Sequence, residues 1–356
     1  MEPKNNKQTE ATNRNRRLTF LYTNADNLIN KRSELLKIIQ IDNADIICVT
    51  ETLPKNVFIP ITKAELQIPG YSCFENIDEE LCQRGVVIYT KHNIHAVRVE
   101  IKEKFHDGIC CEIKLKKPNK NLLVYCIYRS PNSSQENNDE INKFYCDIKK
   151  FSNHEVIIVG DFNFPEIDWV NNIYPVNIEN KATSFYLSTQ SALLTQKVTE
   201  FTHQRPGQNP TLIDLVLTNN DYAVNDINHM APIGKSHHHV LKFDYICGEL
   251  SKVDDCNNDP IYKYHCADYK KLKEELSHVN WSEEIEHSDI DQMWSKFNSV
   301  MQKAIQKYIP KVKVGKSKKV KPLWMNNNAL FKVKRKNHAY HRYLRTKEGQ
   351  DYLEYA

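Results

Sequence analysis

The chain lacks the features that mark membrane, secreted and zinc-binding proteins. No apolar run approaches the ~18 residues that a membrane-spanning helix needs. Residues 1–17 are polar and charged, with no apolar core of the kind a secretory signal contains. The ten cysteines are scattered and none forms a Cys-x-x-Cys pair, so we expect reduced thiols and no zinc site. These absences predict an intracellular protein, nuclear or cytoplasmic, with no membrane partner.

The composition fits an α/β protein with one sizeable domain and an appendage. The chain has 356 residues, of which 40% are hydrophobic, enough to bury a core. Its formal charge of +4 is unevenly distributed. Residues 311–356 carry thirteen basic and three acidic side chains, a net +10, which leaves −6 on residues 1–310. A mildly acidic body is compatible with a metal-dependent site.

The basic segment 311–347 contains no acidic residue. Its cations alternate with the aromatic side chains of Trp324, Phe331, Tyr340 and Tyr343. Cations beside stacking rings are typical of contact with nucleic acid. A solubilising helix or a nuclear-import signal has the same composition, and the sequence leaves both interpretations open.

The most informative stretch runs from Val159 to Phe164, Val-Gly-Asp-Phe-Asn-Phe. The β-branched residues 156–159 before it predict a buried strand that ends at a glycine. Asp161 and Asn163 follow, two residues apart, and such residues face the same way in an extended chain. A carboxylate can hold a hard cation or accept a proton, and an amide can bind phosphate or water, which indicates phosphoester hydrolysis. The alternative is an Asx turn closing the strand.

Five further strand-like runs also end near polar side chains. The runs cover residues 18–23, 44–50, 122–127, 211–217 and 240–243. The polar residues beside them are Asn24, Asp26, Glu51, Tyr128, Arg129, Asp214 and the segment Ser236-His237-His238-His239. Ligand sites in layered α/β folds gather at strand ends, so we expect these groups to form one composite pocket.

This ordered set resembles the endonuclease/exonuclease/phosphatase superfamily, and more narrowly the apurinic-type endonuclease domain of LINE-like (non-LTR) retrotransposon polyproteins. Thr50-Glu51-Thr52, Tyr128-Arg129-Ser130-Pro131 and the segment 212–219 are typical of the retrotransposon branch. The resemblance covers about residues 17–246 and implies an α/β fold, a four-layer α/β/β/α sandwich of the DNase-like type. Lys321-Pro322-Leu323-Trp324-Met325 resembles the start of the linker toward a reverse transcriptase. The reverse transcriptase itself, with its Tyr-x-Asp-Asp loop, is absent, so we interpret the chain as a truncated copy.

Four segments follow from this interpretation. They are a disordered basic leader at 1–16, the endonuclease/exonuclease/phosphatase domain at 17–246, a linker at 247–267 and a helical basic extension at 268–356. Helices are predicted at 31–41, 140–151 and 268–309, and Pro322 should interrupt any helix in the basic segment.

The resemblance implies a metal-dependent endodeoxyribonuclease that nicks one strand of double-stranded DNA, leaving a 3′-hydroxyl for target-primed reverse transcription. It implies Mg²⁺ or Mn²⁺ as cofactor. It assigns catalysis to Asp161, Asn163, His238, Asp214 and Tyr128, metal binding to Glu51, Asp26 and Asn24, and phosphate or DNA contact to Arg129, Thr202 and Ser236. We expect a monomer whose partner is the DNA target, and the element's RNA is a further candidate partner for the segment 311–347.

Two departures from the family pattern bear on activity. The family writes Ser-Asp-His where this chain has Ser236-His237-His238, and imidazole is a poor Mg²⁺ ligand. The segment Gln83-Arg84-Gly85-Val86 replaces a longer glycine run. A catalytically impaired remnant that still binds nucleic acid is therefore the alternative function. A small-molecule phosphatase of the same superfamily is a weaker one, because such relatives lack the retrotransposon motifs.

Overall fold

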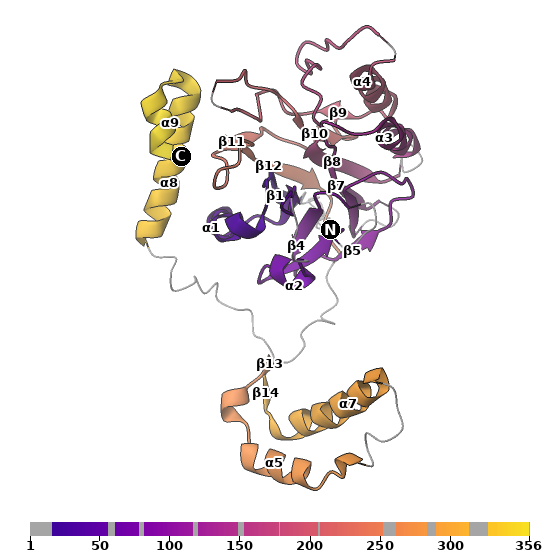
Figure 1. The fold of residues 1–356 in the computed structure, drawn as a ribbon, viewed down its shortest axis with the longest axis vertical. Helices are drawn as coiled ribbons and strands as arrows, with labels where there is room; N and C mark the ends of the chain where they lie inside the picture. The colour runs from indigo at the N-terminus through magenta and orange to yellow at the C-terminus, as the bar shows by residue number, and fades with distance from the viewer. Residues whose placement is uncertain are drawn as a thin grey trace, which may run out of the picture. The chain divides into compact units, whose positions relative to one another are not determined.

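The structure is a computed structural model, and it describes residues 16–55, 61–77, 82–116, 120–148, 153–177, 179–205, 207–251, 261–282, 290–312 and 327–355. The chain forms two compact units, Met1–Lys252 with Pro322–Ala356, and Val253–Lys321 (Figure 1). Residues 1–15 of the predicted leader, Pro322 and Trp324 lie outside the described residues.

Two six-stranded mixed sheets form the body of the first unit. The first sheet has the order β11-β12-β1-β2-β4-β3, with strands at Asn228–Met230, Val240–Cys247, Arg16–Asn24, Ile46–Thr50, Val86–Lys91 and Tyr71–Glu75. The second has the order β5-β6-β7-β8-β10-β9, with strands at Ala96–Val99, Gly108–Ile113, Leu122–Tyr128, Glu155–Asp161, Asp214–Thr218 and Thr195–Gln196. One pair in each sheet is parallel, β1 with β2 and β7 with β8.

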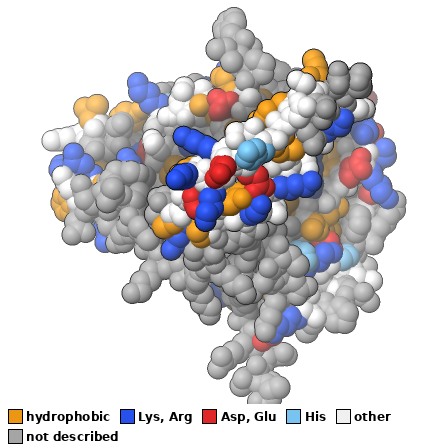
Figure 2. Space-filling model, turned by 90° about the horizontal axis from the view of Figure 1, so that it is seen from below, with side chains coloured by type: hydrophobic (Ala, Val, Ile, Leu, Met, Phe, Trp, Pro, Cys, Tyr) orange, Lys and Arg blue, Asp and Glu red, His pale blue; other side chains and the backbone are white. Residues whose placement is uncertain are grey.

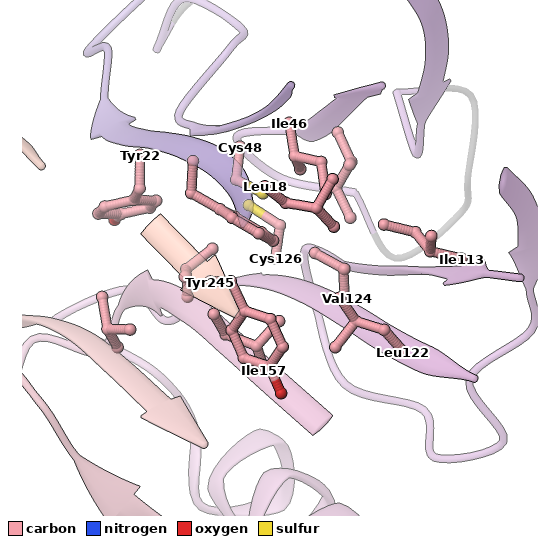
Figure 3. Packing of buried hydrophobic residues seen from close by; sticks show 14 of the residues in the cluster. Leu18, Tyr22, Ile46, Cys48, Ile113, Leu122, Val124, Cys126, Ile157 and Tyr245 are labelled. Carbon is pink, nitrogen blue, oxygen red and sulfur yellow. The ribbon is translucent and has the colours of Figure 1, made fainter. Parts of the chain in front are cut away.

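The sheets and their helices form four layers, and a cluster of buried hydrophobic side chains fills each of the three spaces between them. Leu18, Ile46 and Val124 belong to the cluster between the two sheets, where Cys48 and Cys126 also lie side by side (Figure 3). A second cluster covers the outer face of the first sheet, and a third covers that of the second sheet. The covering helices are α1 at Arg32–Asp42 and α2 at Lys63–Leu66 on the first sheet, and α3 at Gln135–Ile148 and α4 at Lys181–Ser191 on the second. The order is α/β/β/α, which confirms the predicted DNase-like fold.

The apolar runs of the central strands follow from this layering. In β1, Phe20 and Tyr22 face the cluster between the sheets and Leu21 faces the helices. In β8, Ile157 and Ile158 divide in the same way between the inner and outer clusters. Neighbouring residues of a strand point to opposite faces, so a strand covered on both sides needs an unbroken apolar run.

Several elements begin or end at residues other than those predicted. Strand β10 begins at Asp214 and not at residue 211, because the backbone of Thr211 pairs with His203 instead of the sheet. Helix α3 begins five residues earlier than predicted, where the Ser134 hydroxyl accepts the N–H of Asn137 at 3.2 Å. The sheet region also continues past residue 246, since β12 extends to Cys247 and residues 249–251 pair with the 114–116 segment.

The second unit contains the larger part of the predicted helical region 268–309. It comprises β13 at Ile261–Tyr262, the 3-10 turn Tyr264–Cys266, α5 at Tyr269–Ser277, α7 at Ile290–Tyr308 and β14 at Lys311–Val312. Helices α5 and α7 are joined by an ion pair of 2.6 Å between Lys307 and Glu275.

Figure 2 shows a face of the molecule on which basic and acidic side chains are interspersed, with no broad patch of one sign among the coloured atoms.

The described part of the basic segment ends in helix α8, Asn327–Thr346, followed by α9, Gly349–Tyr355. Within the first unit, α8 packs beside β11. The Asn337 side chain accepts the N–H of Ala231 at 3.3 Å, and the buried Tyr340 ring meets the His239 ring edge-on at 5.1 Å. Among the described helices, none has the length and apolarity needed to cross a membrane.

Candidate active site

The predicted catalytic residues lie where parallel strands of both sheets end. Strands β1 and β2 run together, so Asn24 at the end of β1 lies beside Glu51, which follows β2. Strands β7 and β8 run together, which places Tyr128 beside Asp161. Strand β10 runs against β8 and starts with Asp214, opposite Asp161. Strand direction therefore brings these side chains to one edge of the sandwich.

Asn24 joins the two sheets at this edge. Its Nδ2 donates to Glu51 Oε1 at 2.7 Å and to Asp161 Oδ2 at 2.8 Å. Its Oδ1 accepts the backbone N–H of Asp26 at 2.9 Å. In this structure the buried Asn24 amide positions two carboxylates, and its predicted contact with a metal stays a prediction.

His238 lies between two aspartates. Its Nδ1 is 2.8 Å from Asp214 Oδ2, and its Nε2 is 3.8 Å from Asp161 Oδ2. The other oxygen of Asp214 accepts a 2.8 Å hydrogen bond from the Tyr22 hydroxyl, which forms a second link between the sheets. Tyr22 was not predicted, although its place two residues before Asn24 on β1 puts it on the same strand face.

Burial and charge together set the protonation of this group. Burial lowers the pKa of His238, but Asp214, Asp161 and Glu51 outweigh it and raise the pKa to about 9. Burial raises the pKa of Asp214, but its pairing with His238 outweighs burial and the pKa falls below its ordinary value. Burial and the Asp214 charge raise the pKa of Asp161 to about 8. At neutral pH His238 is therefore cationic and is bonded to an ionised Asp214. The pKa of Asp161 lies close to neutral pH, so this carboxyl can gain or lose its proton there.

These side chains open into a cavity of about 590 Å³. Five of the predicted residues line it: Glu51, Tyr128, Asp161, Asn163 and His238. The prediction missed other charged or titratable groups in the wall, namely Lys55, Arg84, His203 and Arg205. Carboxylates and an imidazole that share one cavity with cations suit a phosphodiester, which is anionic and must be attacked by water.

Asn163 forms an Asx turn with Asp161 and also lines the cavity. Its φ is 51°, and its N–H donates to Asp161 Oδ1 at 3.2 Å, which makes the Asx turn weighed above. Its Nδ2 donates to the Arg129 carbonyl at 2.9 Å. The turn nevertheless leaves both side chains in the cavity wall. Gly160 before it has no alternative, because an added Cβ would lie 2.0 Å from the Ile127 carbonyl oxygen.

Three residues predicted to contact phosphate are buried and bonded to protein groups. The Thr202 hydroxyl accepts the N–H of Asp214 at 3.0 Å, and the Ser236 hydroxyl donates to the Asn24 carbonyl at 2.8 Å. Arg129 is 3% exposed and donates to three protein oxygens. Among the described residues that line the cavity, none of these three is present. Their observed contacts hold other site residues in place, and their direct contact with phosphate stays a prediction.

His237 lies beside the site, not in the wall of this cavity. It lines a neighbouring pocket of about 290 Å³ together with Tyr340 of α8, and its carbonyl accepts the N–H of Gln204 at 3.0 Å. Burial, Arg205 and His238 lower the pKa of its imidazole, so it is neutral at pH 7. It brings no negative charge where the family pattern has an aspartate.

Arg84 provides positive charge at the predicted metal ligands. Its guanidinium forms an ion pair with Glu51 and lies 3.1 Å from Asp26 Oδ1. Burial raises the pKa of Asp26, but Lys31, Lys55 and Arg84 outweigh it and hold the pKa below its ordinary value. Asp26 and Glu51 also adopt left-handed backbone angles, with φ of 40° and 51°. Such angles are costly outside glycine and concentrate at functional sites.

The chemistry of the donor set fits a hard divalent cation. Glu51 and Asp26 offer carboxylate oxygens, the ligands that Mg²⁺ and Mn²⁺ prefer. Asp161, Asp214 and His238 also offer one atom each within 4.8 Å of one another, but Asp214 and His238 are already bonded to each other. We therefore place the candidate metal position at Glu51 and Asp26, the carboxylates that Arg84 contacts.

Comparisons with known proteins found one similar family and several similar solved structures. A family model described as endonuclease-reverse transcriptase matches residues 122–241. The AP endonuclease LMAP from Leishmania major has a TM-score of 0.51 at 14% identity and covers 65% of this chain and 88% of that chain. The endonuclease domain of TRAS1, a telomere-specific non-LTR retrotransposon, has a TM-score of 0.48 at 13% identity, covering 64% and 98%. The Xenopus laevis APE2 catalytic domain has 0.48 at 17%, covering 66% and 94%. No curated protein matches the chain.

The four-layer sandwich, which the Leishmania enzyme shares, defines a DNase-like α/β protein with a polar site at its strand ends. The matched segment contains Tyr128, Asp161, Asn163, Asp214 and His238. Residues 122–241 are thus similar to the endonuclease-reverse transcriptase family, and the chain shares the fold of the Leishmania AP endonuclease.

Proposed function

We propose that this chain is a metal-dependent DNA endonuclease that nicks one strand of double-stranded DNA. The match of residues 122–241 to an endonuclease-reverse transcriptase family supports a nuclease-type hydrolase in general. The observation that carries the proposal is the row of Asp161, His238 and Asp214, with Glu51 beside it, at a cavity of about 590 Å³. These groups supply a proton acceptor, a cation for a phosphate oxygen and a carboxylate for a metal.

In the proposed reaction, Asp161 orients the attacking water and accepts its proton. His238, kept cationic by Asp214, donates a hydrogen bond to the scissile phosphate and stabilises the charge that develops there. Tyr128 and Asn163 bind the remaining phosphate oxygens. Glu51 and Asp26 would hold Mg²⁺ or Mn²⁺, which when bound supplies Lewis-acid stabilisation of the leaving 3′-oxygen.

The 3′-hydroxyl so released is the primer end that target-primed reverse transcription by a non-LTR retrotransposon needs. The match to an endonuclease-reverse transcriptase family supports this biological role. The basic segment 311–347 supports contact with nucleic acid, either the DNA target or the element's RNA.

An impaired nucleic-acid-binding remnant is the second candidate, and two observations favour it. The neutral His237 removes a negative charge next to the site, and Arg84 neutralises the carboxylates that remain. Both changes weaken the attraction for a divalent cation.

Nicking of supercoiled plasmid by the full chain separates the two candidates. The assay is run with Mg²⁺, with Mn²⁺ and with EDTA, and Asp161→Asn is the matched control because it keeps the shape of the side chain. Conversion to open circle with metal, absent with EDTA and in the control, supports the endonuclease. A folded protein that binds DNA but nicks with neither metal supports the remnant.

A further inference from the structure

We propose that Arg84 is an internal competitor for the metal position, so that its guanidinium must leave Glu51 and Asp26 before a divalent cation binds. This inference rests on the proposed function and names a residue of this chain that controls its cofactor. Arg84 contacts both carboxylates through one nitrogen, Nη2. A guanidinium and a divalent cation on the same oxygens repel each other, so the two occupy the position in turn.

The loop that carries Arg84 is built to hold it there. The buried Asp107 carboxylate accepts the backbone N–H groups of Gln83, Arg84 and Gly85 at 2.8–3.1 Å. Gly85 has a φ of 69°, and an added Cβ would lie 2.5 Å from the Thr52 hydroxyl oxygen. The position of Arg84 is therefore set by a fixed loop, and not by a chance surface contact.

The Arg84 side chain is only partly satisfied in this position. Its Nε and Nη1 are buried and have no hydrogen-bond partner among the described residues. Buried donors without partners are costly, so ionic contact with Glu51 and Asp26 is what retains the side chain. A divalent cation that neutralises those carboxylates removes this attraction. The released guanidinium then offers unused N–H groups to a phosphate oxygen of the substrate.

The test measures Mn²⁺ binding to the full chain without DNA, by the electron paramagnetic resonance signal of free Mn²⁺. Arg84→Gln should lower the Kd about tenfold or more, because it removes a positive charge in contact with the metal ligands. Arg205→Gln is the matched control, since Arg205 is an exposed arginine that lines the same cavity, and it should change the Kd by less than about threefold. Glu51→Gln, added to Arg84→Gln, should abolish the tight binding.

Thermal unfolding establishes that each variant is folded. If Arg84→Gln does not fold, Arg84→Met replaces it and should also lower the Kd about tenfold, because methionine carries no charge and has a side chain of similar length. Equal Kd values for the wild type and the Arg84 variant, with metal-dependent nicking intact, overturn the competition and leave the proposed function standing. Absence of Mn²⁺ binding in every variant, together with absence of nicking, overturns both.

Discussion

Replacement of Arg129 by methionine distinguishes a supporting side chain from a DNA contact. Arg129 Nε donates to Asn138 Oδ1 at 2.7 Å, and Nη1 donates to the carbonyls of Phe162 and Asn163 at 3.1 Å each. The guanidinium also lies 3.7 Å from the centre of the Phe164 ring. The side chain thus ties the Asp-x-Asn turn to helix α3.

The expected loss of stability follows from these contacts. Methionine keeps an apolar side chain of similar length but leaves three acceptors without a donor, and each unsatisfied buried group costs about 1–3 kcal/mol. Since such costs do not add fully, we expect the free energy of unfolding to fall by about 3–5 kcal/mol. In a domain of this size each kcal/mol lowers Tm by about 2–4 °C, so Tm should fall by at least about 6 °C.

Thermal unfolding followed by circular dichroism measures this change, and anisotropy of a labelled DNA duplex well below Tm measures binding. Arg129→Lys is the control that keeps the charge but cannot reproduce the forked hydrogen bonds, so it should also lose stability. The reasoning is refuted if Arg129→Met lowers Tm by less than about 2 °C while DNA affinity falls. That result would establish the phosphate contact predicted from the sequence.

The remaining predictions concern charge at the site. Nicking should increase with pH toward about 8, where Asp161 loses its proton, and decrease above about 9, where His238 does; a flat profile from pH 6 to 10 would contradict both roles. Asp214→Asn removes the main cause of the raised His238 pKa, so nicking should fall about 10- to 100-fold and its decrease at alkaline pH should begin at a lower pH. If that decrease begins at the same pH as in the wild type, Asp214 does not control the protonation of His238. Asp161→Asn should reduce nicking at least about 100-fold without lowering Tm, and a fall in Tm instead would make Asp161 a structural turn residue. His237→Asp should increase nicking and tighten Mn²⁺ binding about tenfold; no change in either would mean that position 237 does not limit the site.

Residue order alone predicts the central strands and the polar groups at their ends. An apolar run such as 156–159 is decided by neighbours within one strand, and the direction of β1, β2, β7 and β8 then carries Asn24, Glu51, Tyr128 and Asp161 to one edge. The gathering of these side chains in one pocket was therefore predictable from the strand pattern, whereas the DNase-like fold was predicted from the resemblance to a known superfamily. The ends of β10 and α3 were less predictable, because the pairing of Thr211 with His203 and the serine cap of α3 decide them.

The positions of the charged side chains Arg84 and Arg129 depend on contacts between segments that are distant in the sequence. Arg84 reaches Glu51 only because Asp107, more than twenty residues later, holds its loop, and neither residue belongs to a periodic pattern. Arg129 follows a strand like the catalytic residues, yet it turns into the protein, where helix α3 supplies its partner. A strand pattern repeats every two residues and so can be followed along the chain. The direction in which a charged side chain turns depends instead on which oppositely charged or hydrogen-bonding groups the folded chain places within a few ångströms.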